Sequence, residues 1–225
     1  MDFKLEHKSI SLADQIFDKL ENDILVGIYN KGEVITELKL SEQLGVSRTP
    51  IREALRRLEQ ENIISMTTKG AMIIGISPDD IEAIYEIRER IEGYAARRAA
   101  TMASEEEIKA LADIVDLQGF YIQKEDAQQI MDCDSKFHRA LYSMSNSVPL
   151  YSTLTELHKK VIKFRRVSVE MSERAKSSYG EHRAIYEAIA SHNGDLSEAL
   201  TTEHVKNARE SIRKKIEAAK TKTEA

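Results

Sequence analysis

The stretch SRTPIREALRRL occupies residues 47–58 and decides how the rest of the chain is interpreted. Ser47 belongs to a residue type that caps helices, because its hydroxyl can accept a hydrogen bond from a free backbone N–H of the first turn. Pro50 falls within that turn, where a missing N–H breaks no helical hydrogen bond. Apolar residues recur at i, i+4 and i+7 and predict one face that packs against a protein body: Ile51, Leu55 and Leu58.

The arc beside this apolar face is basic. At about 100° per residue, Thr49, Arg52 and Arg56 share that arc, and Arg48 lies at the N-terminal tip. A short capped helix with an apolar back and an arginine front can lie in a DNA major groove. The alternative is a solvated amphipathic helix without a ligand, so the flanking segments decide between the two.

Those flanking segments predict a winged helix-turn-helix over residues 1–76. A first helix begins near Ser11, and a second runs from a Thr36 cap to Gly45, two residues before the arginine-rich helix. Residues 63–67 and 71–76 then predict two strands of a hairpin, or wing, with Lys69 and Gly70 at its tip. The residues expected at DNA are Ser47, Arg48, Thr49, Arg52, Arg56, Lys69 and Gly70.

Residues 77–220 have helical periodicity throughout and predict a second, all-α domain. We expect a bundle of about six helices, over residues 78–102, 104–124, 126–145, 149–170, 172–192 and 195–219. Residues 221–225 form a polar tail. The predicted fold class is therefore mainly α, with an N-terminal winged helix-turn-helix followed by an all-α helical bundle.

Composition limits the location and the partners of the chain. Its 225 residues are 41% hydrophobic, yet no apolar run approaches the roughly 18 residues of a membrane span. The first residues contain no apolar signal segment, and the single cysteine, Cys133, fits a reducing cytoplasm as a small packed residue. We therefore expect a cytoplasmic protein without a membrane partner. Because the net charge is -5, any DNA contact must come from a local basic patch.

Polar residues on apolar helix faces predict a metal site in the second domain. Asp134 and His138 have i, i+4 spacing on the core face of one helix. His182 and His204 lie eleven residues before and after Asn193, the centre of the last turn, so both rings stand at one height, roughly 16 Å from it. Three imidazoles and a carboxylate suit a divalent ion, with Zn²⁺ or Ni²⁺ preferred.

The alternative is that each of these histidines is a hydrogen-bonded core residue. The remaining histidines, His7, His158 and His192, lack comparable neighbours, and we interpret them as surface or turn residues.

Arg88 falls on the face of its helix that also carries Ile84 and Ile91. An unpaired buried charge is very costly, so this guanidinium needs either an internal carboxylate or a bound anionic ligand. Arg165, beside another apolar stripe, is a weaker candidate of the same kind. Both are therefore candidate contacts for an anionic effector.

The segment Leu44 to Leu55, LGVSRTPIREAL, resembles the recognition segment of the GntR superfamily of bacterial transcription regulators. The segment YEIRERIE at 85–92, Asp134 with His138, Glu181 with His182, and His204 resemble the helical effector domain, of FCD type, in its FadR branch. The similarity covers roughly residues 9–217. One departure is Leu38, with Lys39 next to it, where some members of the superfamily carry a DNA-contacting arginine.

This resemblance implies a homodimeric DNA-binding regulator, often a repressor of catabolic genes, that is released by a small carboxylate effector reaching a metal in the bundle. Because one small winged domain buries too little surface for tight specific binding, we expect the dimer to bind an inverted-repeat operator. By motif match, Arg48, Thr49 and Arg52 contact bases and phosphates, and Gly70 allows the wing to approach the minor groove. Two alternatives remain. One is a helical-bundle metalloenzyme with a DNA-binding module, although the chain has no His-Glu-x-x-His motif. The other is the same regulator with structural histidines and a lipid-like effector.

Overall fold

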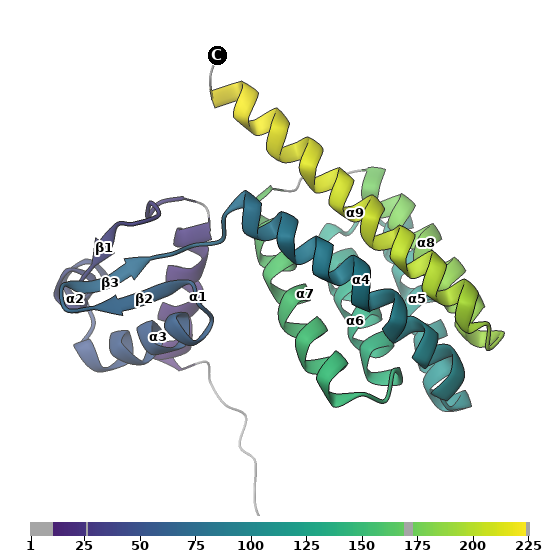
Figure 1. Ribbon diagram of the computed structural model, residues 1–225. Coiled ribbons are helices and arrows are strands. Elements are labelled where there is room, and N and C mark those ends of the chain that lie inside the picture. Colours follow the sequence, from purple (N-terminus) through teal and green to yellow (C-terminus); the bar gives the residue numbers. More distant parts are fainter. Residues whose placement is uncertain (1–10, 26, 169–172, 224–225) are drawn as a thin grey trace, which may run out of the picture. The chain divides into compact units, whose positions relative to one another are not determined.

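The computed structural model describes residues 11–25, 27–168 and 173–223. These residues form nine helices and three strands, divided between two compact units, Met1–Ser77 and Pro78–Ala225 (Figure 1). Each unit is described by itself.

The first unit is a winged helix-turn-helix, as the sequence predicts. Its helices are α1 (Leu12–Leu25), α2 (Glu37–Leu44) and α3 (Arg48–Gln60). The antiparallel strands β1 (Val34–Ile35), β2 (Ile64–Thr67) and β3 (Gly70–Ile73) follow the order β1-β3-β2. Helices and sheet share one apolar core, in which the α3 face made of Ile51, Leu55 and Leu58 is at most 1% exposed.

The turn between α2 and α3 follows the expected capping pattern, with one exception. The Thr36 hydroxyl accepts a hydrogen bond from the Lys39 backbone N–H, and Gly45 ends α2 in the left-handed conformation at φ 66°. Ser47 occupies the N-cap position of α3, but its side chain makes no capping hydrogen bond, so that expectation was wrong. Pro50 removes one of the two possible donors. It stands at the third helical position, one of the two whose N–H a cap residue normally binds, and has no N–H to donate.

The wing differs from the predicted hairpin at both ends. β3 begins at Gly70 and ends at Ile73, whereas strands were expected over 63–67 and 71–76. The two-residue strand β1, which the sequence analysis missed, pairs Ile35 with Ala71. Gly70 has φ 134°, and a Cβ atom there would lie 2.5 Å from the Ile35 carbonyl oxygen. The fold itself therefore requires this glycine, independently of any approach to DNA.

The described residues of the second unit form six long helices, as predicted. They are α4 (Pro78–Met102), α5 (Glu105–Gln123), α6 (Ala127–Met144), α7 (Val148–Ser168), α8 (Glu173–Ala190) and α9 (Gly194–Thr223). α9 runs beside α4 and also packs against α8, while α5 lies between α6 and α8 (Figure 1). α9 continues past the predicted end at residue 219 and contains the start of the segment expected to be a tail. An apolar core formed by α4 to α9 surrounds the polar residues described below.

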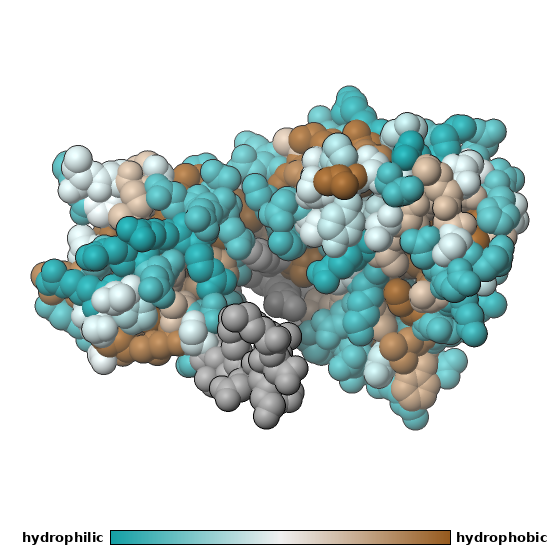
Figure 2. Space-filling model, turned by 90° about the horizontal axis from the view of Figure 1, so that it is seen from below, coloured by the Kyte–Doolittle hydropathy of each residue, from teal (hydrophilic) through white to brown (hydrophobic). Residues whose placement is uncertain are grey.

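The surface of the second unit carries scattered apolar groups. Figure 2 shows separate hydrophobic patches within a mainly hydrophilic face. Large exposed hydrophobic side chains of this unit include Ile87, Tyr94, Phe120 and Val148. Among the described residues, no helix combines the length and the apolar character needed to span a bilayer.

Candidate metal centre and DNA-reading face

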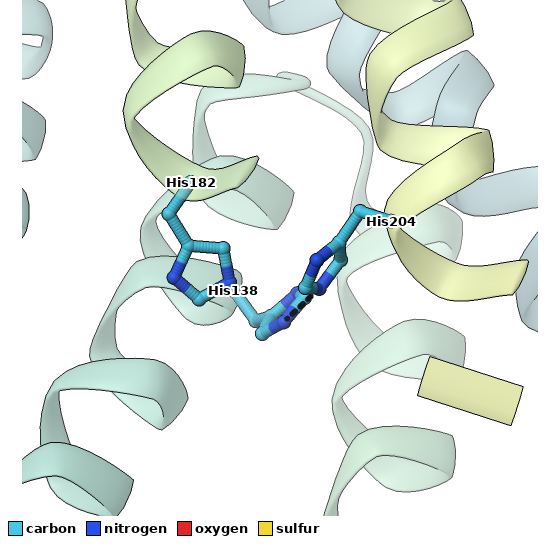
Figure 3. Close-up of side chains that lie close together, drawn as sticks. All are labelled: His138, His182 and His204. Carbon is cyan, nitrogen blue, oxygen red and sulfur yellow. Dashed lines mark hydrogen bonds between the residues drawn. The ribbon is translucent and has the colours of Figure 1, made fainter. Parts of the chain in front are cut away.

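Three imidazoles from three helices meet inside the second unit. His138 on α6, His182 on α8 and His204 on α9 point toward one another (Figure 3), and one nitrogen of each lies within 4.8 Å of the others. The Nε2 atoms of His138 and His204 are 3.3 Å apart. All three residues are at most 3% exposed. The structure thus brings together the three histidines that the spacing singled out.

Asp134 lies beside the three histidines, but it is not among the residues whose candidate ligand atoms all lie within 4.8 Å of one another. One turn before His138 on α6, its Oδ1 lies 4.0 Å from His182 Nε2. Its Oδ2 lies 4.0 Å from His158 Nε2. Asp134 is 4% exposed, so a carboxylate stands beside the three imidazoles in a site shielded from water.

His158 corrects the sequence interpretation, which assigned it to the surface or a turn. It is 7% exposed, its ring centroid is 4.6 Å from that of His138, and neither ring nitrogen has a hydrogen-bond partner among the described residues. The missed signal is its position on α7, four residues after Leu154 and three before Val161, both of which are buried. His192 lies in a turn as expected, whereas His7 is outside the described residues.

Burial sets the protonation of these rings. Desolvation holds the pKa values of His158 and His182 well below the ordinary value, and it also lowers the pKa of His204. Desolvation disfavours the charged form of an imidazole, so these three rings are neutral at pH 7. Neutral imidazole is the form that binds a metal ion.

Arg88 has an internal carboxylate partner. Its Nε and Nη2 donate to Glu92 at 2.8 and 3.2 Å, and both side chains are at most 3% exposed. His138 Nδ1 lies 2.7 Å from Glu92 Oε1, the same oxygen that accepts from Arg88 Nη2. The neighbouring Arg88 and His138 hold the pKa of Glu92 well below its usual range despite burial. Arg88 also lines a pocket beside the histidines, so an effector contact remains a prediction.

The pocket beside the three histidines is small and polar. It holds about 30 Å³ of free space, and its lining includes Arg88, Asp134, His158, Arg174 and Ser178. Arg174, which the sequence analysis did not select, forms a two-bonded ion pair with Glu181 at 2.8 and 2.6 Å. The side chain of the predicted contact Arg165 lies outside the described part of the structure, although its backbone belongs to α7.

In the first unit, α3 presents the predicted basic arc to solvent. Arg48, Thr49, Arg52 and Arg56 are exposed, as are Ser47 at the helix start and Lys69 in the wing. Arg52 Nε and Nη2 donate to the two carboxylate oxygens of Glu37 on α2, at 2.8 and 2.7 Å.

Arg57, on the same helix, stabilises the packing of α3 against α1. Its guanidinium pairs with Asp14 of α1 and lies 4.0 Å from the centre of the Phe17 ring. The arginines of α3 therefore divide into an exposed group and one that ties α3 to α1.

Comparison with known proteins gives two family matches. Residues 12–74 match the model of bacterial regulatory proteins of the gntR family, and residues 83–207 match the FCD domain.

Full-length relatives agree with these matches. The chain is 31% identical to the Nta operon transcriptional regulator of Aminobacter aminovorans over 178 residues, which are 79% of this chain and 83% of that one. It is 27% identical to the HTH-type transcriptional repressor RspR of Escherichia coli over 200 residues, 88% of each chain. A solved structure of E. coli McbR/YncC has a TM-score of 0.69 at 20% identity and covers 92% of this chain and 100% of its own. The Nta operon regulator and RspR are named as transcription regulators, which argues against the metalloenzyme alternative.

Proposed function

This chain belongs to the GntR family of bacterial regulatory proteins and is a transcription regulator with an FCD domain, and we propose that it is a metal-containing repressor released by a small organic acid. In this proposal it binds an inverted-repeat operator as a homodimer, and the effector binds in the helical unit.

The exposed arc of α3 supports DNA reading. Arg48, Thr49, Arg52 and Arg56 are free of the apolar core, and the wing offers Lys69 beside Gly70. Arginine can bind guanine O6 and N7 bidentately, while wing residues and hydroxyls contact the backbone. One small winged domain buries too little surface for tight specific binding, which favours two copies on a symmetric operator. The exposed apolar side chains of the helical unit are candidates for the dimer contact.

The observation that carries the metal proposal is the convergence of His138, His182 and His204. Ligand atoms about 2.0–2.1 Å from a tetrahedral Zn²⁺ are roughly 3.3–3.4 Å apart, and the two Nε2 atoms of His138 and His204 are 3.3 Å apart. With Asp134 as a fourth donor, the set contains the nitrogen and oxygen ligands that Zn²⁺ and Ni²⁺ accept. A divalent ion held by three neutral imidazoles and one carboxylate would carry a net charge of about +1 and attract an anion.

The polar pocket favours a small carboxylate over a lipid-like effector. Besides Tyr85, Ala208 and Ile212, its lining consists of two arginines, three histidines, two serines, a lysine and an aspartate, which would leave a lipid chain against desolvated polar groups. Its free space of about 30 Å³ has room for one or two water-sized groups, so the effector has to displace side chains as it binds. Arg88 and Arg165 are the predicted contacts, and Arg174 joins them because it borders the same pocket.

The test is operator release by small carboxylates with and without metal. Fluorescence anisotropy with DNA from the chain's own promoter region should report tight binding by both metal-loaded and chelator-treated protein. At least one acid of a panel should release the metal-loaded protein and leave the chelator-treated protein bound. If the same acid releases both forms from DNA, the metal is not needed for the response to the effector. If the protein binds no promoter DNA, it is not a repressor.

A further inference from the structure

The three imidazoles of the candidate metal centre share a feature on their outer sides. The Nδ1 atom of each ring faces an oxygen from a residue outside the predicted ligand set. Glu92 Oε1 on α4 is 2.7 Å from His138 Nδ1. Gln118 Oε1 on α5 is 2.9 Å from His182 Nδ1, and Glu181 Oε2 on α8 is 2.6 Å from His204 Nδ1.

These contacts fix where the ring protons lie. A carboxylate or carbonyl oxygen only accepts hydrogen bonds, so each Nδ1 carries the hydrogen and donates it outward. A neutral ring with its hydrogen on Nδ1 presents an unprotonated Nε2 on its opposite side, and Figure 3 shows the three rings facing one another. The Nε2 atoms of His138 and His204 face each other 3.3 Å apart. The outward hydrogen bonds thus direct both Nε2 atoms at a position that one ion could occupy.

The charges of the three acceptors are balanced within the site. Glu92 pairs with Arg88, and Glu181 pairs with Arg174. Gln118 is uncharged, is 1% exposed, and has no such arginine in the pocket lining beside it. The acceptors therefore orient all three rings while adding no net negative charge, which leaves the centre attractive to an anion.

We propose that Glu92, Gln118 and Glu181 are positioning residues that hold the three imidazoles in the metal-binding tautomer, with Gln118 as the neutral member that keeps the acceptor set without net charge. This inference rests on the proposed metal centre and assigns roles to residues that do not themselves contact the ion. Outer partners of this kind typically change metal affinity by about 10–100-fold when they are removed.

Gln118→Met is the direct test, because it keeps the length of the side chain and removes the acceptor oxygen. Its matched control is Gln123→Met, the same change at an exposed position of the same helix. The Zn²⁺ dissociation constant is measured by competition with a chromogenic chelator. It should rise about 10–100-fold for Gln118→Met and stay within about twofold of wild type for Gln123→Met. Gln118→Glu, which retains an acceptor oxygen, should bind Zn²⁺ at least as tightly as wild type.

A second measurement distinguishes a change in the orientation of the imidazole ligands from a general loss of folding. The visible absorption spectrum of Co²⁺-loaded protein reports the coordination of the ion, and it should change in Gln118→Met and persist in Gln118→Glu. If Gln118→Met does not fold, as judged by lost operator binding, Gln118→Asn replaces it, because the shorter amide withdraws its oxygen from His182.

The outcomes are distinct. Equal Zn²⁺ affinity and an unchanged Co²⁺ spectrum in wild type, Gln118→Met and Gln118→Asn would overturn the positioning role and leave the metal centre intact. A wild-type protein that binds neither ion would overturn the metal centre itself, and the positioning role with it.

Discussion

His158 is a buried imidazole without a hydrogen-bond partner among the described residues, and such a group lowers stability unless a ligand uses it. A buried unsatisfied polar group costs roughly 1–3 kcal/mol, so His158→Leu should raise the free energy of unfolding of the metal-free protein by about 1 kcal/mol. Urea denaturation measures this change, and Lys159→Leu on the exposed side of α7 is the control.

The same substitution should weaken the response of operator binding to the effector, because His158 borders the pocket. A variant that is less stable than wild type and still responds fully would show that His158 is an ordinary core residue.

The buried histidines also predict how stability depends on pH. The folded-state pKa values of His158, His182 and His204 are lowered, while the unfolded chain takes up these protons near pH 6.5. The unfolded state therefore binds more protons below that pH, and stability is lost as the pH falls. The slope should reach about 1.4 kcal/mol per pH unit for each histidine.

Urea denaturation of metal-free protein between pH 7.5 and 5.5 measures this dependence. Glu181 does not contribute in this window, because its pKa is lowered to about 2 by its hydrogen bonds with His204 and Arg174. His182→Leu should give a shallower slope than wild type. Stability that stays constant or rises toward pH 5.5 would contradict the neutral, desolvated state of these rings.

At the level of elements, two of the four arginines of helix α3 are placed for different roles. Arg52 is exposed and held by Glu37, whereas Arg57 binds Asp14 and covers Phe17. Arg52→Ala should abolish specific operator binding with the fold intact, because a bidentate arginine–guanine contact is worth roughly 1–3 kcal/mol and a dimer loses two. Arg57→Ala should keep operator binding and lower the melting temperature.

Anisotropy with operator and with scrambled DNA, beside a thermal melt, distinguishes the two variants. If Arg52→Ala binds the operator as tightly as wild type, or if Arg57→Ala is the variant that loses binding, α3 does not read DNA through the proposed arc.

The helices were predictable because their signals are local. Thr36, Gly45 and Pro78 mark helix ends by their own conformational preferences, and apolar periodicity identifies the buried faces. The strand β1 was not predictable, because two residues carry no period and pair only with a distant strand. The missing Ser47 cap could have been anticipated, since Pro50 removes a donor that the cap would bind.

The part of the candidate site that depends on residue spacing along helices was predictable from the sequence. The mirrored positions of His182 and His204 and the i, i+4 pair of Asp134 and His138 depend only on helical geometry. The partners of these residues were not predictable, because Glu92, Gln118 and Glu181 reach the site from other faces or helices. Arg88 illustrates the limit. The apolar face on which Arg88 lies predicted that its side chain is buried. The position of Glu92 in the structure was needed to show that an internal carboxylate pairs with the guanidinium.

At the scale of the whole molecule, the proposed function predicts two copies of the chain on one operator. Sedimentation velocity at micromolar concentration should show a dimer, and a footprint on the operator should show two half-sites related by a two-fold axis. The isolated helical unit is the natural control, because the dimer contact is expected there and not in the winged unit. A monomer in sedimentation, or one unrepeated footprint, would contradict this arrangement.

In the proposed mechanism, one ion bound by the histidines links effector binding to DNA release, while the winged helix-turn-helix unit binds DNA without that ion. The most direct measurement is the metal content of purified wild type, His182→Ala and His204→Ala, determined by elemental analysis beside operator affinity. We expect about one Zn²⁺ or Ni²⁺ per chain in the wild type and none in either variant. Both variants should retain most of their operator affinity and lose the effector response. A stoichiometric ion retained in both variants would contradict the account.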